Sequence, residues 1–299
     1  MPVIGFLSAQ SHDVTGHRLR AFRRGLQEVG YAEGENVVVE YRWAEAQADR
    51  LPVLAADLVR RRVTVISTTG NAPALAAKAA TTTIPIVFAV SEDPVRMGLV
   101  ASLARPTGNL TGINFLSAEV ATKRLEFLRQ LVPAAANIAV LINPAAPVTE
   151  TTLREVGAAA SAMGLRIRIL NAHTSGDIHA AFGTFQGERP DALFVSGGFL
   201  FSSRRVQLVH LATHYAVPAA YADREYAEIG GLMSYGDDPA ETLRQNGIYT
   251  GRILRGMKPT ELPVVQSSKF ELVINNETAR ILGLKVPPTV LATADEVIE

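Results

Sequence analysis

The residues best suited to hold a ligand form a small polar turn. The sequence VISTTGN ends in Thr68, Thr69, Gly70 and Asn71, and an alanine-rich helical pattern follows directly. A turn of this kind presents hydroxyl groups and backbone N–H groups at a helix N-terminus, where anions and the polar ends of ligands bind. The pattern predicts a binding turn for a polar ligand. The alternative is that Thr69 or Asn71 only caps the helix.

Catalytic motifs do not accompany this turn. The sequence contains no Walker A phosphate loop, no GxGxxG after its first strand and no GxSxG nucleophile elbow. His210 and His214 are spaced like a metal-binding pair on a helix, but HExxH is absent and an ordinary helix face is the better interpretation. Cysteine is absent, which excludes thiolate nucleophiles and cysteine-bound zinc. We therefore expect no catalytic residue, no metal and no cofactor.

Composition excludes further classes of protein. Lys and Arg together number 29, as do Asp and Glu, so the chain lacks the basic excess of a nucleic-acid-binding surface. No apolar run reaches the roughly 18 residues that span a bilayer. The 299 residues suffice for two domains with separate cores. The chain opens on a strand pattern without a leader, which fits a cytosolic protein or an exported one whose signal peptide has been removed.

Short apolar runs alternate with helical patterns, which is typical of an α/β fold with parallel sheets. The order of elements occurs twice, since Gly30 after the first helix corresponds to Gly164, and Gly70 corresponds to Gly198. This internal repeat predicts two homologous α/β halves, with a single doubly wound sheet as the alternative. The expected strands include 3–7, 37–43, 63–67, 138–142, 166–172 and 192–196, and the expected helices include 19–29, 51–61 and 178–185.

Ligands of open α/β sheets bind outside the carboxyl ends of the strands. The expected strand ends are rich in Ser, Thr, Asn and Gly, with one acid in each half. Such a set suits a small polar or zwitterionic molecule, and it would line one cleft of a hinged clamp if the halves face each other. The candidate ligand-binding residues are Ser8, Gln10, Thr68, Thr69, Gly70, Asn71, Ser91, Asp93 and Asn114 in the first half and Gly197, Gly198, Phe199, Tyr221, Asp223 and Tyr235 in the second.

Three long stretches resemble a known family. They are FRRGLQEVGYAEGENVVVEYRWAEAQADRLPVLAADLV, PIVFAVSEDPVRMGLVASLARPTGNLTGINF and the C-terminal KFELVINNETARILGLKVPPTVLATADEVIE. In this order they are similar to the ABC-transporter substrate-binding proteins, a family that includes the aromatic amino-acid (tryptophan-type) uptake receptors. The similarity extends over nearly the whole chain.

The resemblance implies a type I periplasmic-binding-protein fold, in which two Rossmann-like lobes with parallel sheets close on a ligand like a Venus flytrap. The expected lobes are residues 1–115 with about 237–258 and residues 116–236 with about 259–299, with the ligand cleft between them. The resemblance also implies a monomer without catalytic activity. Such a protein is exported behind a signal peptide, is periplasmic or membrane-anchored on the outside, and delivers a small molecule to a membrane permease with a separate ATPase.

The family's pocket carries over onto this sequence only in part. Its Thr-Gly-Thr turn corresponds to Thr69-Gly70-Asn71, and its Asp-Pro corresponds to Asp93-Pro94, although Asp93 also suits a cap. Where the family often has Asp-Asn in the second lobe, this chain has Ser196-Gly197-Gly198-Phe199 and lacks that acid for an α-ammonium group. Asp223, at the next strand end, could supply one. Phe199, Tyr221 and Tyr235 are candidates to pack an apolar or aromatic ligand, with core positions as the alternative.

Two other classes of protein stay open. The same fold serves as the ligand-sensing core of transcription regulators and signalling receptors, but the sequence shows no helix-turn-helix module before Val3. A two-lobed α/β enzyme, such as a racemase or a glycosyltransferase, would need paired thiols or a metal-binding DxD motif. Neither occurs in the sequence.

Overall fold

The chain forms two compact units. In this computed structural model the described residues are 1–45, 47–115, 117–146, 148–267 and 270–299. The first unit comprises Met1–Leu116 and Pro239–Ser268, and the second comprises Ser117–Asp238 and Lys269–Glu299. Each unit has a mainly parallel sheet with helices on both faces, which confirms the expected α/β fold class.

The first unit is built on a six-stranded sheet with the order β11-β5-β4-β3-β1-β2, in which all neighbours are parallel. The central strand β4 (Ile86–Val90) is buried along its whole length, as expected where helices cover both faces of a parallel sheet. The other strands are β1 (Val3–Ser8), β2 (Val38–Trp43), β3 (Val65–Thr69), β5 (Leu110–Phe115) and β11 (Val265–Ser267).

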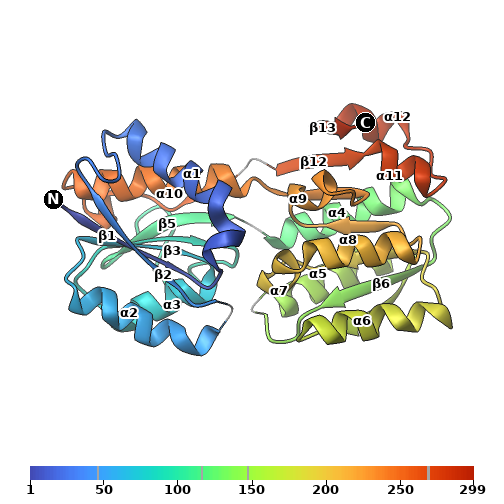
Figure 1. Ribbon diagram of the computed structural model, residues 1–299, viewed down its shortest axis with the longest axis horizontal. Helices are drawn as coiled ribbons and strands as arrows, with labels where there is room; N and C mark the ends of the chain where they lie inside the picture. Colours follow the sequence, from blue (N-terminus) through green and yellow to red (C-terminus); the bar gives the residue numbers. More distant parts are fainter. Residues whose placement is uncertain (46, 116, 147, 268–269) are drawn as a thin grey trace. The chain divides into compact units, whose positions relative to one another are not determined.

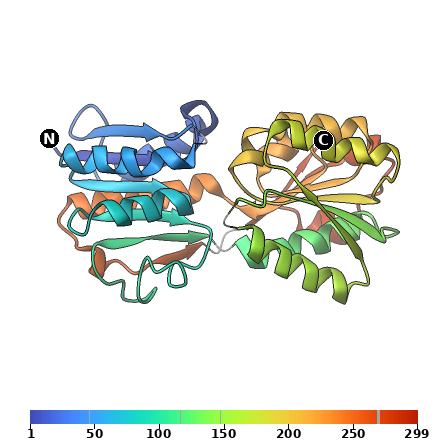
Figure 2. The same ribbon diagram turned by 90° about the horizontal axis from the view of Figure 1, so that it is seen from below.

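Helices α1 (His12–Glu28) and α10 (Pro239–Leu254) cover one face of this sheet, and α2 (Leu51–Arg60) and α3 (Asn71–Ala80) cover the other (Figure 1). The view from below shows the blue α2 beside the teal α3 (Figure 2). Helices α1 and α10 cross closely because Gly25 has no side chain: a Cβ there would lie 1.9 Å from the Arg244 carbonyl oxygen. Two 3-10 helices, η1 (Ala48–Arg50) and η3 (Pro259–Glu261), complete the unit.

The second unit has a seven-stranded sheet with the order β13-β12-β10-β9-β8-β6-β7, in which β12 runs antiparallel to β10. Its strands are β6 (Asn137–Ile142), β7 (Arg166–Asn171), β8 (Ala192–Val195), β9 (Ala219–Tyr221), β10 (Met233–Asp237), β12 (Phe270–Asn275) and β13 (Glu296–Ile298). One face packs on α4 (Ser117–Leu131), α5 (Thr149–Ala162), α11 (Asn276–Ile281) and α12 (Pro288–Thr293). The other face packs on α6 (Ser175–Gly183), η2 (Thr184–Gln186), α7 (Phe199–Ser203), α8 (Arg205–His214) and α9 (Arg224–Glu228), of which α6 and α8 lie in front in Figure 1.

Several boundaries differ from the sequence analysis; α1, for example, begins at His12 where the sequence analysis expects residue 19, and two other differences change the assignment of residues. Strand β3 covers Val65–Thr69 instead of 63–67, so Thr68 and Thr69 belong to the strand and not to the turn. The segment 259–268 lies in the first unit, whereas the sequence analysis expects it in the second. The reason is that β11 pairs in parallel with β5 and extends the first sheet.

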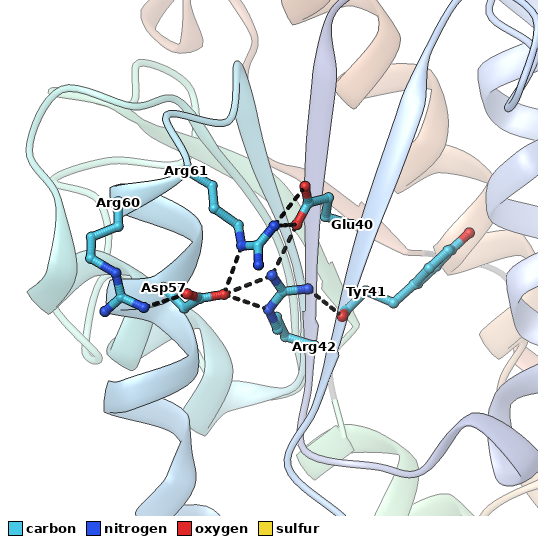
Figure 3. A network of polar contacts seen from close by, with 6 residues as sticks. All are labelled: Glu40, Tyr41, Arg42, Asp57, Arg60 and Arg61. Carbon is cyan, nitrogen blue, oxygen red and sulfur yellow. Dashed lines mark hydrogen bonds and ion pairs between the residues drawn. The ribbon is translucent and has the colours of Figure 1, made fainter.

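A network of charged side chains joins α2 to the edge strand β2 (Figure 3). Arg42 Nη2 lies 2.6 Å from Asp57 Oδ2 and 2.9 Å from Glu40 Oε2. Arg60 and Arg61, at the end of α2, form further ion pairs with Asp57. Charged side chains on an edge strand also oppose its pairing with a strand of another molecule.

Candidate functional site

In the first unit, hydrogen bonds join the ends of β1 and β3. Ser8 and Thr69 are paired residues of these strands, and the Thr69 hydroxyl donates a hydrogen bond of 3.1 Å to Ser8 Oγ. Ser8 Oγ also accepts a hydrogen bond of 3.1 Å from the backbone N–H of Gln10. Three of the residues expected from the sequence therefore lie together at the carboxyl edge of the sheet.

Asn71 connects this edge to the end of β4. Its Nδ2 donates to Ser91 Oγ at 3.2 Å, and its Oδ1 accepts from the Ser91 backbone N–H at 3.0 Å. Helix α3 begins after Gly70, whose φ of 99° favours glycine, and this N-cap residue offers no side-chain cap. Thr69 and Asn71 thus bond to neighbouring strand ends within the described residues. The structure does not support the alternative that they only cap α3.

Some buried polar atoms at this edge have no hydrogen-bond partner among the described residues. Asn114 in β5 is fully buried, and its Nδ2 donates to the carbonyl oxygens of Val90 and Glu92 at 3.1 and 2.8 Å. Its Oδ1 has no hydrogen-bond partner among the described residues, nor has the hydroxyl of the fully buried Thr68. An unpaired buried polar atom costs about 1–3 kcal/mol. A ligand that completed either hydrogen bond would therefore be favoured.

Asp93 stabilises the turn that follows β4. Its Oδ1 accepts hydrogen bonds from the backbone N–H groups of Val95 at 2.8 Å and Arg96 at 3.3 Å. This is the capping role that the sequence analysis leaves open for Asp93. It occupies one of the two carboxylate oxygens with the protein's own backbone.

In the second unit, the glycine turn after β8 lies beside the residues that follow β9. Gly198, with a φ of 133°, precedes α7, whose first residue is Phe199. A Cβ at Gly197 would lie 3.9 Å from the Cβ of Ala222, the residue before Asp223. Asp223 is the N-cap residue of α9, but its side chain does not cap that helix. The structure therefore brings the glycine turn and the Asp223 segment together.

Of the two tyrosines expected at this edge, Tyr221 packs into the core and the half-buried Tyr235 packs against it. Tyr221 is fully buried and stacks on Tyr226 with a ring-centroid distance of 4.4 Å. Burial raises the pKa of the Tyr221 hydroxyl, which finds no hydrogen-bond partner among the described residues. Tyr235 packs edge-on against Phe127 at 5.1 Å, on the other face of the sheet. The structure does not place these two rings together with the glycine turn.

Tyr221 belongs to a different feature of the second unit, a cavity of about 300 Å³. Gly231, Leu232 and Asn275 also line it. Leu232 directly precedes β10, and Asn275 ends the antiparallel strand β12. The cavity therefore lies at the amino ends of the parallel strands, opposite the edge that carries Asp223.

Trp43 is a candidate that the sequence analysis misses. It is the last residue of β2 and pairs with Ser8 of β1, so it adjoins the polar edge of the first unit. Its half-buried ring stacks on Tyr41 at 5.8 Å with an angle of 4° between the planes, and Phe6 lies at 5.6 Å. The signal was present in the sequence, since the chain's single tryptophan ends an expected strand.

Arg124 is the second residue that the sequence analysis misses. It belongs to the amphipathic helix α4 and is only 4% exposed, although its side chain is charged. It stands four residues from both Val120 and Leu128, which are buried, so the helical period already places it on the apolar face. Burial lowers the pKa of its guanidinium to about 10, while the charges of Asp223 and Asp237 oppose this shift.

Comparison with known proteins shows the family to which the chain belongs. The model of a family described as "ABC transporter substrate binding protein" matches residues 3–298. The chain belongs to this family. Proteins of the family are receptors that bind small-molecule substrates outside the cytoplasm and work with an ABC transporter. Within the described part of this substrate-binding protein, no helix is long and apolar enough to cross a membrane.

Individual relatives of this substrate-binding protein cover nearly its whole length. A tyrosine-binding protein of Clostridioides difficile (strain R20291) is 25% identical over 283 residues, which are 94% of this chain and 81% of the relative. The crystal structure of an ABC domain in complex with L-Trp from Streptococcus pneumonia is 25% identical, with a TM-score of 0.90 and 99% of both chains covered. A conserved domain protein from Vibrio cholerae is 27% identical, with the same TM-score and coverage. The fold is that of the type I periplasmic binding proteins.

The side chains at the strand ends of the first unit are of a kind that binds ligands through hydrogen bonds. Among the described residues, no group of three or more His, Asp or Glu side chains is placed to hold a metal ion. The strand-end side chains of the first unit, Ser8, Thr69, Asn71 and Ser91, are neutral hydrogen-bonding groups. Such groups recognise a polar ligand by direct hydrogen bonds.

Proposed function

We propose that this substrate-binding protein captures an aromatic amino acid for uptake. The observation that carries the proposal is made at the start of α3. The N-cap residue, Gly70, provides no side-chain cap, and hydroxyl and amide groups lie around this helix end. Uncapped N–H groups at a helix N-terminus favour a carboxylate. Two relatives support the class of ligand, one described as a tyrosine-binding protein and one solved with L-Trp.

An amino acid carries a negative α-carboxylate and a positive α-ammonium group. The first unit offers hydrogen-bond donors, and the second offers a carboxylate. In the first unit, the Ser8 hydroxyl and the Asn71 amide offer neutral donors at the positive end of the α3 dipole, and the Thr69 hydroxyl can turn from Ser8 to join them, which suits the α-carboxylate. In the second unit, Asp223 offers a carboxylate for the α-ammonium group. We propose that both units contribute to binding, with Gly197 and Gly198 allowing the ligand a close approach to the backbone.

Trp43 is proposed to contact the aromatic ring of the ligand. It is paired with Ser8 on the neighbouring strand. Its ring stacks on that of Tyr41, and Trp43 is the member of this pair nearer the carboxyl edge. Aromatic pairs contribute about 0.5–1.5 kcal/mol beyond the area that they bury. Phe199, at the start of α7, is the proposed aromatic contact of the second unit.

The proposed partners follow from the family. The protein delivers its ligand to a membrane permease with a separate ATPase, and it works as a monomer in the periplasm or anchored to the outer side of a membrane. Neither nucleic acid nor a cofactor takes part. No residue is assigned a catalytic role, so a ligand recovered after incubation should be unchanged in mass and chirality. Turnover that follows the protein through purification would contradict this.

Calorimetric titration and melting curves test the proposed ligand class. L-Tyrosine, L-tryptophan and L-phenylalanine are compared with L-leucine, L-glutamate and a hexose. A ligand at a hundredfold excess over its Kd stabilises the folded protein by about 2.7 kcal/mol, which raises the melting temperature measurably. We expect the aromatic amino acids to bind most tightly. Stabilisation by the hexose alone, or by no amino acid, would contradict the proposal.

A further inference from the structure

A buried arginine bridges β8 and β10, the two strands on either side of β9, which Asp223 follows. The Nε of Arg124 donates a hydrogen bond of 2.8 Å to the carbonyl oxygen of Tyr235 in β10, and Nη1 donates one of 3.5 Å to the carbonyl oxygen of Val195, the last residue of β8. Strand β9 lies between β8 and β10, and Asp223 follows its end. The guanidinium also lies 5.3 Å from the centre of the Phe194 ring.

The charges around Arg124 come from the same edge. Asp223 after β9 and Asp237 at the end of β10 are the carboxylates that stabilise the buried cation. The other titratable groups that face it, Tyr226 and Tyr235, have pKa values raised by burial and are neutral near pH 7.

A structural role in helix packing does not require this charge. Val120 and Leu128, one turn away on either side of Arg124, are apolar core residues. Replacing a buried ion by an apolar residue of similar volume is often neutral or stabilising, because the ion must be removed from water on folding. The cation at this position is therefore better explained by its interactions with the neighbouring carboxylates and backbone carbonyl groups.

We propose that Arg124 is a positioning residue that holds Asp223 as the ionised acceptor for the α-ammonium group of the ligand. The proposal rests on the proposed function, because it needs a ligand with an ammonium group. Arg124 acts in two ways. Its hydrogen bonds fix β8 and β10 on either side of β9, and its charge offsets the repulsion between Asp223 and Asp237.

A double-mutant cycle separates this role from general support of the fold. The affinity for L-tyrosine is measured by calorimetry for the wild type, Arg124→Gln, Asp223→Asn and the double variant. Loss of the carboxylate should weaken binding about tenfold or more. Arg124→Gln should weaken binding about fivefold alone and less than about twofold when Asp223 is already Asn. Equal factors in both backgrounds, or no effect of Asp223→Asn, would overturn the proposal.

Two further variants keep the result independent of folding yield. Arg124→Lys retains the positive charge but loses the guanidinium that reaches both carbonyl oxygens, so its affinity should lie between those of the wild type and Arg124→Gln. An affinity as low as that of Arg124→Gln would mean that the charge is not what Asp223 needs, and would overturn the proposal. Arg129→Gln is the matched control, since Arg129 lies on the same helix and donates to the carbonyl oxygens of Val132 and Pro133. It should leave the affinity unchanged.

The two proposals fail in different ways. If the wild type binds another amino acid but neither L-tyrosine nor L-tryptophan, the aromatic ligand class is wrong, and the cycle is measured with the amino acid that binds. If the wild type binds no amino acid, both proposals are wrong. If the aromatic amino acids bind and the cycle shows no coupling between Arg124 and Asp223, only the role of Arg124 is wrong.

Discussion

Thr69 distinguishes a ligand-binding turn from a purely structural one. Its hydroxyl donates to Ser8 Oγ, and in the proposed complex it turns to donate to the ligand carboxylate instead. Thr69→Val keeps the β-branched shape and removes the hydroxyl. A hydrogen bond to a charged group contributes about 1.5–3 kcal/mol, so we expect the Kd for L-tyrosine to rise about tenfold or more.

Calorimetry and a melting curve on the same variant decide this prediction. Thr293→Val is the matched control, because the Thr293 hydroxyl donates to a carbonyl oxygen within α12 and lies on the surface. A lower melting temperature with an unchanged Kd for Thr69→Val would show that the turn is structural.

Trp43 offers a second test at the residue scale. Trp43→Phe keeps an aromatic ring and should bind L-tyrosine within about threefold of the wild type, whereas Trp43→Leu should bind about three- to tenfold more weakly. The wild type also carries its own reporter, since Trp43 is the only tryptophan and its fluorescence should change on titration with L-tyrosine. Equal affinities of Trp43→Leu and the wild type would remove Trp43 from the site.

The sequence allows some site residues to be predicted and not others. Ser8, Thr69, Asn71 and Ser91 are predictable because each stands where an apolar β-rich run ends, and parallel strands end at one edge. Tyr221 also ends a strand, but the side-chain alternation of a short strand does not show that its ring turns into the core against Tyr226. The geometry of Arg124 depends on carbonyl groups far away along the chain, which no local pattern reveals.

At the scale of elements, the contact between β2 and α2 depends on an ionised carboxylate (Figure 3). Hydrogen bonds from Arg42, followed by those from Arg61, hold the pKa of Asp57 below its usual value. A carboxyl group whose pKa is lower in the folded state stabilises the fold above its unfolded pKa of about 3.9. That stabilisation is lost as the pH falls through the folded-state pKa.

Asp57→Asn should therefore melt at a lower temperature than the wild type near pH 7. The difference between their melting temperatures should shrink as the pH falls below about 4, because the wild type then loses the same charge. Melting curves between pH 7 and pH 3 measure this. A difference that stays constant over this range would show that the network stabilises the fold by packing alone.

The elements themselves are predicted better than their assignment to sheets. The strands and helices of both halves follow from apolar periodicity, and the repeat predicts two α/β units. In the described part of the misassigned segment 259–268, the 3-10 helix η3 is followed by the three-residue strand β11, which joins β5 from a distant part of the chain. A strand this short has no pattern that identifies its partner, so only tertiary pairing places it in the first sheet.

At the scale of the whole molecule, the proposed site draws on both units, which the chain joins at 116–117, 238–239 and 268–269. Hydrogen exchange tests this directly. With saturating L-tyrosine, exchange should slow at the backbone N–H groups of Asn71 and Ala72 in the first unit and of 197–199 in the second, because both turns are proposed to meet the ligand. Helix α2 around Asp57 is the internal control and should exchange at the same rate with and without ligand. Protection confined to one unit would mean that the ligand binds to that unit alone, and that the residues assigned to the other have a different role.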